Sequence, residues 1–179
     1  MSTRLVILGL LRERPLYGYE IKQIIEEHME DWTSIAFGSI YFALGKLTEE
    51  GFLENVGTQQ AGSRPSRNIY QITEAGRNEF LRLLRATWSD FERQYYALDI
   101  GIFFMNALSK GEILGYLDKR IAFLEATLKH ISGHQAEEMG TAEVPPFAEA
   151  IFTHSILHMQ AELQWTKFVL EKVNRGDYL

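Results

Sequence analysis

The chain has 179 residues, of which 46% are hydrophobic and 23% charged, a balance typical of a folded globular protein. It contains no cysteine, which excludes disulfide scaffolds, thiolate zinc sites and cysteine nucleophiles. The net charge is −6. Residues 1–85 carry ten Lys and Arg against eleven Asp and Glu, so most of the excess negative charge falls in residues 86–179. A nucleic-acid site in this chain would require a local basic patch.

No run of about 18 apolar residues is present, and the first residues lack the layout of a cleavable signal peptide. We therefore expect a cytoplasmic protein that does not associate with membranes. The sequence also contains no glycine-rich phosphate loop, nucleophile elbow or kinase signature, which argues against an enzyme and against a bound cofactor.

Three short helices are predicted in the first 50 residues. The first carries an apolar stripe from Leu5 to Leu11 and ends before Pro15, because proline lacks a backbone N–H and disfavours helix in the residue before it. The second helix spans about 17–29. The third spans about 37–50, where apolar residues recur at i, i+3, i+4 and i+7, and Gly51 ends it.

The apolar period then changes from that of a helix to that of a strand. Residues 52–57 and 68–73 are predicted to be two strands, joined by residues 58–67, a segment with two arginines and no acid that is typical of a hairpin tip. Thr73 is placed to cap a fourth helix. The order helix, helix, helix, strand, strand, helix predicts a winged helix-turn-helix domain in residues 1–85.

Residues 86–179 are predicted to be all-helical. Ser109 and Glu112 form a capping box that opens a helix to about residue 138, and a last helix spans about 147–174. Two helices of this length cannot bury their apolar faces alone, so we expect a dimerisation domain. The predicted fold is mainly α with a small β-hairpin.

Six segments of residues 4–80 carry a family resemblance: LGLL at 8–11, PLYGYEI at 15–21, GSIYFAL at 38–44, EGFL at 50–53, RPSR at 64–67 and YQITEAG at 70–76. They resemble the PadR-type transcriptional regulators. Glu162 and Trp165 in the last predicted helix are similar to the C-terminal domain of the larger members. The resemblance implies a homodimer that binds double-stranded DNA at a near-palindromic operator, as a repressor.

The sequence departs from the family pattern at three positions. Phe42 stands where the family usually has Pro, Gly45 where it has a polar or basic residue, and Thr48 where it has an acid. All three are expected on or near the groove-facing side of the third helix. The operator sequence therefore cannot be transferred from relatives.

The third helix is the expected recognition helix, which enters the major groove in a helix-turn-helix. With its apolar stripe inward, the residues expected to face DNA are Ser39, Tyr41, Phe42, Gly45 and Lys46, together with Gly38 of the family motif. Tyr41 and Phe42 could instead pack on the domain, and Phe42 is expected to be the more buried of the two. Tyr19 lies near the start of the second helix, whose backbone N–H groups suit a phosphate, although a core role also explains this residue.

Arg64 and Arg67 at the hairpin tip suit phosphates or a narrow minor groove. The alternative is a solvated loop. If Lys46, Arg64 and Arg67 each neutralise one phosphate, a dimer contacts roughly six, and the logarithm of affinity should fall with the logarithm of salt at a slope of about −5. The acidic net charge leaves a second function open, a winged-helix protein–protein interaction module without direct DNA binding.

An aromatic stretch follows the fourth helix and is a candidate effector pocket, with core packing as the alternative. Members of the family respond to phenolic acids or flat hydrophobic drugs, so the resemblance implies a small ligand of this class. The candidate pocket residues are Trp88, Tyr95, Tyr96, Asp99 and Phe103.

His154, His158 and Glu162 fall at i, i+4 and i+8 on one face of the last predicted helix. Two histidines four residues apart can chelate zinc with a carboxylate as third ligand. The pattern lacks the internal glutamate of the zinc protease motif, and helix histidines paired with a neighbour are common. No metal is expected.

Overall fold

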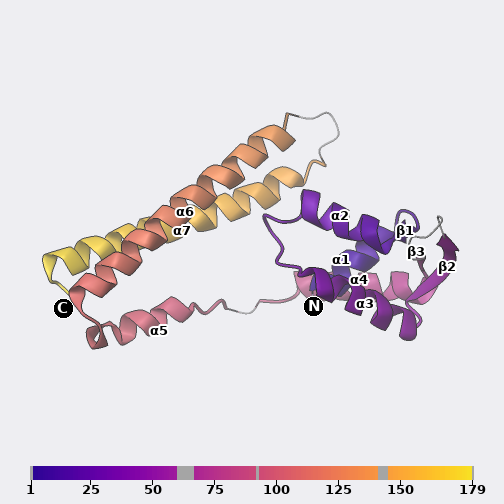
Figure 1. Ribbon diagram of the computed structural model, residues 1–179, viewed down its shortest axis with the longest axis horizontal. Helices are drawn as coiled ribbons and strands as arrows, with labels where there is room; N and C mark the ends of the chain where they lie inside the picture. Colours follow the sequence, from indigo (N-terminus) through magenta and orange to yellow (C-terminus); the bar gives the residue numbers. More distant parts are fainter. Residues whose placement is uncertain (1, 60–66, 92, 141–144, 179) are drawn as a thin grey trace. The chain divides into compact units, whose positions relative to one another are not determined.

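The computed structural model describes residues 2–59, 67–91, 93–140 and 145–178. The chain divides into two compact units, Met1–Glu92 and Arg93–Leu179 (Figure 1). The sequence analysis placed the division after residue 85. The fold class predicted from the sequence, mainly helical with a small antiparallel sheet, is confirmed.

The first unit contains four helices and three strands in its described residues. In chain order they are α1 (Ser2–Leu11), β1 (Leu16–Tyr17), α2 (Gly18–His28), α3 (Phe37–Glu49), β2 (Leu53–Gln59), β3 (Arg67–Ile72) and α4 (Glu74–Trp88). The strands form one antiparallel sheet in the order β1-β3-β2. The predicted hairpin is therefore present, with a third strand that the sequence analysis assigned to a loop and the start of a helix.

Strand β1 is only two residues long, which is too short to show an alternating pattern. Strand β1 forms because the edge of β3 that does not face β2 is available for pairing. Leu16 pairs with Tyr70 there, and Tyr17 pairs with Ile69. On the other side of β3 the register shifts between Asn55 and Gly57, which marks a β-bulge in β2.

The core of the first unit is built around α1, which packs against both α3 and α4. Leu8 and Leu11 of α1 are buried, as are Leu44 and Leu47 of α3, so the inward stripes predicted from the sequence are confirmed. Arg4 of α1 donates two hydrogen bonds, of 3.0 and 2.5 Å, to the carboxylate of Glu50 after α3. This ion pair lowers the pKa of Glu50.

The end of α3 and the start of α4 are joined by one hydroxyl group. Gly51 ends α3 in the left-handed region at φ 78°, as predicted. The Oγ1 atom of Thr73 donates to the Gly51 carbonyl at 2.8 Å and accepts from the Gly76 N–H at 3.0 Å, which confirms the predicted cap. The orientation of α3 is thereby tied to the sheet and to α4.

Gly76 lies where the chain after α3 crosses the first turn of α4. A Cβ atom added at Gly76 would stand 2.1 Å from the Phe52 carbonyl oxygen, and that oxygen belongs to rigid backbone. In contrast, a Cβ atom added at Gly45 of α3 meets no atom within 4 Å.

We expect Gly76→Ala to lower the free energy of unfolding by roughly 3 kcal/mol, because the clash forces a backbone shift. The matched control Gly45→Ala should raise it by about 1 kcal/mol, because alanine is the better helix former and has room. Urea unfolding followed by circular dichroism measures both changes. Equal stability of the two variants would contradict the close approach at Gly76.

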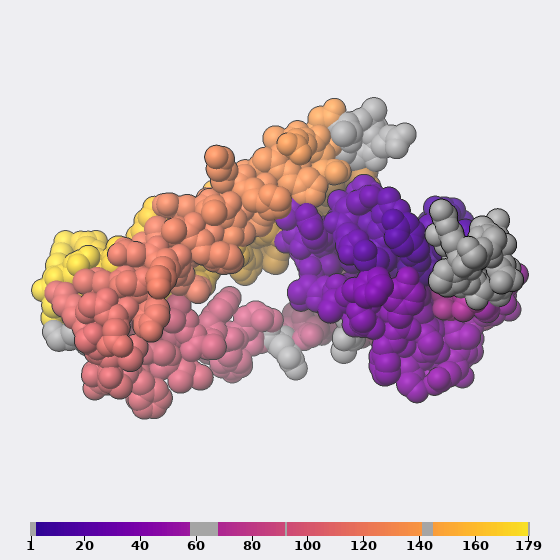
Figure 2. All heavy atoms as spheres, viewed as in Figure 1, coloured from indigo at the N-terminus to yellow at the C-terminus, as the bar shows by residue number. Residues whose placement is uncertain are grey.

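The second unit is helical throughout the regular structure of its described residues. Its elements are α5 (Ala97–Phe103), a 3₁₀ turn η1 (Met105–Ala107), α6 (Lys110–Glu138) and α7 (Ala148–Arg175). Helices α6 and α7 lie side by side as a hairpin (Figures 1 and 2). Among the described residues of the aromatic stretch after α4, Ala97–Phe103 is the part that forms α-helix.

The ends of the long helices follow the signals in the sequence. The backbone N–H of Ser109 donates to Glu112 at 3.0 Å and the Ser109 hydroxyl accepts from the Glu112 N–H at 3.3 Å, so the predicted capping box opens α6. Gly176 ends α7 at φ 83°. Between the helices, Leu117 and Val169 are buried together in a core cluster. None of the helices in the described ranges is both long and apolar enough to cross a membrane.

Candidate nucleic-acid interface

The side of α3 that faces away from the core carries two glycines and a phenylalanine, followed by the exposed Lys46 and Glu49 at its end. Gly38, Phe42 and Gly45 recur at i, i+4 and i+7, opposite the buried Ile40 and Leu44. A Cβ atom added at Gly38 or Gly45 meets nothing within 4 Å. The Phe42 side chain is 69% exposed. The Phe42 ring therefore projects from the helix between two glycines that add no side chain beside it.

Tyr41 lies against the start of α2 instead. Its ring centroid is 5.0 Å from that of Phe37, and a Cβ atom added at Gly18 would stand 3.1 Å from its Cε1 atom. Tyr41 is 42% exposed, so the expectation that Phe42 is the more buried aromatic is wrong. The reason is the absence of a side chain at Gly18, which leaves room for the tyrosine ring and not for its neighbour.

Ser39 is half-buried near the start of α3. Its hydroxyl donates to the Ala36 carbonyl at 2.6 Å, so its proton is already used within the helix. The oxygen retains acceptor capacity. Ser39 can therefore accept a hydrogen bond from an outside donor without losing its own.

Lys46, the predicted cation of α3, is exposed but paired. Its Nζ atom lies 2.7 Å from Glu49, and this hydrogen bond raises the pKa of Lys46. An exposed pair of this kind contributes little to stability, so an anion of higher charge density can displace the glutamate.

A second cation was missed by the sequence analysis. The Nζ atom of Lys22 in α2 lies 2.8 Å from Glu26 and 5.2 Å from the centroid of Phe37, and the hydrogen bond to Glu26 raises the pKa of Lys22. It is also close enough to Tyr19 and Tyr41 to interact electrostatically with both. The signal in the sequence was the spacing of three residues from the exposed Tyr19, which puts both on one helix face.

The predicted wing contacts are only partly within the described structure. The backbone of Arg67 pairs with Gln59 at the last described rung of the hairpin. The side chain of Arg67 and all of Arg64 lie outside the described residues.

Comparison with known proteins places these features in a family. The model of the transcriptional regulator PadR-like family matches residues 7–82. The chain is 26% identical over 175 residues to the negative transcriptional regulator PadR of Bacillus subtilis (strain 168), covering 94% of this chain and 96% of that protein. Residues 7–82 thus match the PadR-like family of transcriptional regulators, and nearly the whole chain is similar to a member of that family.

Solved structures of Bacillus subtilis PadR share the fold. The crystal structure in complex with operator DNA has a TM-score of 0.78 at 24% identity and covers 97% of this chain and 99% of that one. The crystal structure in complex with p-coumaric acid has a TM-score of 0.72 at 22% identity and covers 96% and 98%.

Two of the three departures from the PadR pattern, Phe42 and Gly45, lie on the outward side of α3. The third does not offer its polar group to that side. Thr48 is half-buried and its hydroxyl donates to the Leu44 carbonyl at 2.8 Å. Thr48 therefore lies near the outward side without presenting its hydroxyl there, because that group bonds back within the helix.

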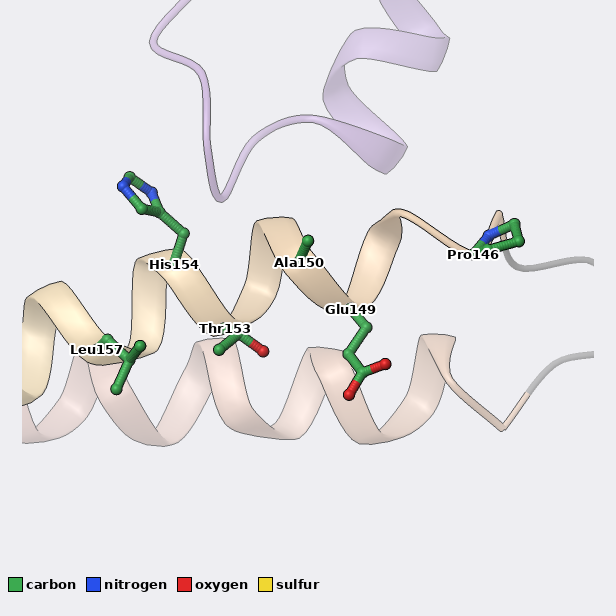
Figure 3. Close-up of a pocket in the computed structure, with 6 residues that line it drawn as sticks. All are labelled: Pro146, Glu149, Ala150, Thr153, His154 and Leu157. Carbon is green, nitrogen blue, oxygen red and sulfur yellow. The ribbon is translucent and has the colours of Figure 1, made fainter.

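The residues of the candidate effector pocket are exposed in both units. Trp88 ends α4 in the first unit, whereas Tyr95, Tyr96, Asp99 and Phe103 belong to the second. A shallow hollow in the second unit lies elsewhere, at the first turns of α7 (Figure 3). There Ala150 and His154 project from one side of the helix and Leu157 from another, so these side chains do not converge on a common point where a small molecule could bind.

The three candidate metal ligands of α7 are separated by their own contacts. Glu162 accepts a hydrogen bond of 2.5 Å from Arg120 of α6. The rings of His154 and His158 contact each other, with centroids 4.5 Å apart. Within the described ranges these three side chains do not bring their ligand atoms together as one metal-binding group.

The pairing of Lys22 can be tested by titration. We expect Glu26→Gln to lower the pKa of Lys22 toward its ordinary value, because the hydrogen bond that favours its charged form is lost. Glu27→Gln is the matched control, since Glu27 accepts from Gln23 instead. Nuclear magnetic resonance of the lysine Nζ groups measures both, and an unchanged Lys22 pKa in Glu26→Gln would contradict the pairing.

Proposed function

We propose that this PadR-family regulator binds operator DNA directly through α3, Lys22 and the hairpin tip, and that it acts as a repressor and not as an enzyme. The observation that carries the proposal is the free outward side of α3, on which Phe42 is exposed. Helix-turn-helix proteins place this side of the second helix of the motif in the major groove. A relative with the same fold has been solved in complex with operator DNA, and the curated relative is a negative regulator.

The proposed contacts divide into two kinds. Lys22, Lys46, Arg64 and Arg67 would neutralise phosphates, and the backbone at the start of α2 near Tyr19 would donate hydrogen bonds to a phosphate. The groove would be met by Gly38, Ser39, Tyr41 and Phe42, with Gly45 allowing close approach.

We further propose that the functional form is a homodimer joined through the second unit. Helix α5 contains no buried residue. A seven-residue helix depends on packing for its stability, and within its own unit α5 packs against the core through the partly buried Ile102, so a partner that covers its exposed side would stabilise it. A second copy is the occupant we propose, because the exposed apolar side chains extend from α5 onto the long helices. They are Tyr95, Tyr96, Ile100, Phe103, Phe104, Leu108, Tyr116, Phe123, Leu157 and Phe168.

Two copies related by a two-fold axis require a near-palindromic operator with half-sites about one helical turn apart. An effector that changes the spacing of the two recognition helices would release the DNA, provided that it binds the two arrangements with different affinity. A phenolic acid is the class we propose, since Bacillus subtilis PadR has been solved with p-coumaric acid. Tyr95, Tyr96, Asp99 and Phe103 of the second unit remain the proposed contacts.

Selection of binding sites from random duplex DNA tests the function. We expect enrichment of a two-fold symmetric sequence. With Lys22 added to the three other cations, a dimer contacts about eight phosphates, and the log–log salt slope should be about −7. Lys22→Ala should return the slope to about −5.

Failure to enrich any sequence at low salt, with and without p-coumaric acid, would contradict direct DNA binding. It would favour a protein–protein interaction module, an alternative motivated by the glutamate partners of Lys22 and Lys46. A salt slope near zero on an enriched site would contradict only the proposed phosphate contacts and would leave direct DNA binding in place.

The dimer is tested by sedimentation equilibrium. We expect the wild-type chain to be dimeric, and Ile100→Asp to shift it to monomer by at least tenfold in dissociation constant, because a carboxylate would be buried in an apolar interface. Asp99→Asn is the matched control, since it alters a neighbouring exposed residue without adding a charge. A monomeric wild type, or an Ile100→Asp variant that dimerises as well as the wild type, would contradict the proposal.

A further inference from the structure

The outward side of α3 is unusual for a groove-reading surface because its centre has no hydrogen-bonding side chain. Gly38 and Gly45 contribute backbone only, and Phe42 between them has a hydrocarbon ring. Within the described part of the chain, no aromatic ring or cation stacks on Phe42, whereas Phe37 and Tyr41 stack on each other. The Phe42 ring is therefore free to meet an outside surface.

The chemistry of the ring restricts what it can recognise in a major groove. Base edges there present hydrogen-bond donors and acceptors that a phenylalanine cannot pair. The single apolar group on the groove floor is the 5-methyl group of thymine, and aromatic contact with it is an established form of base readout.

The flanking glycines determine how far the ring can reach. A side chain at position 38 or 45 would stand between the α3 backbone and the base edges. Since both positions lack a Cβ atom and have open space around them, the helix can approach closely enough for Phe42 to touch the groove floor.

We infer that Phe42 is a specificity residue that reads a thymine 5-methyl group in each half-site of the operator. The inference rests on the proposed DNA-binding function and adds to it the base that the centre of α3 selects. It predicts a thymine at a fixed position of every strongly enriched half-site.

Replacement of thymine by deoxyuridine is the test, because it removes the methyl group and leaves base pairing and the O4 acceptor in place. Each thymine of the enriched site is replaced in turn, and affinity is measured by fluorescence anisotropy. At the position read by Phe42, we expect a loss of about fourfold per half-site, the equivalent of one buried methyl group, and on the order of 15-fold for both.

The variant Phe42→Ala assigns the effect to this residue. It should bind the thymine and deoxyuridine operators with equal affinity, and its fold should be intact because the ring is exposed. Phe42→Leu should retain part of the thymine preference. Leu81→Ala, which removes another exposed apolar side chain of the first unit, should leave the preference at its wild-type value.

Failure of the inference can be distinguished from failure of the proposed function. If a site is enriched and bound, but every deoxyuridine replacement is neutral, DNA binding stands and the role of Phe42 is overturned. The same holds if Phe42→Ala discriminates as the wild type does. If no DNA is bound at low salt, with or without p-coumaric acid, the proposed function fails and the inference with it.

Discussion

The packing of one side of α3 against α1 determines what the rest of this protein can present to a partner. Four α3 residues are buried against the core, so the residues half a turn away are forced outward whatever their polarity. The Thr73 hydroxyl adds a second constraint by tying the end of α3 to the start of α4. An exposed phenylalanine at position 42 is a consequence of this geometry, and the proposed base readout depends on it.

The charges of the first unit act in a different way from its shape. Lys22 and Lys46 each have a glutamate within hydrogen-bond distance. The Lys46 pair is exposed and Lys22 is half-buried beside an exposed Glu26, and pairs that reach solvent in this way are weak and are exchanged for phosphate at small cost. We therefore attribute affinity in the proposed complex to many modest, salt-sensitive contacts and attribute selectivity to α3. This division explains how a nearly neutral domain in an acidic chain can still bind a specific DNA sequence.

The second unit depends on a different constraint: few side chains of its own unit cover α5. Helices α6 and α7 bury Leu117 and Val169 between them and add ion pairs such as Lys167 with Glu125, at 2.7 Å. Helix α5 contacts this cluster through the partly buried Ile102, and none of its residues is fully buried. A homodimer would cover it, which is why assembly and the proposed effector response are expected to share one surface.

Helix boundaries, caps and the inward stripes followed from local signals, because period, capping box and C-terminal glycine act over a few residues of neighbouring sequence. The resemblance to the PadR-like family followed from the same residues. Strand β1, the room at Gly18 for Tyr41, the exposure of Phe42 and the position of Lys22 did not follow, since each depends on an element distant in sequence. Sequence alone determined the helices, the hairpin and the family that they resemble. Only the tertiary structure decided which of two adjacent aromatic rings is the more exposed, because that depends on the space that α2 leaves at Gly18.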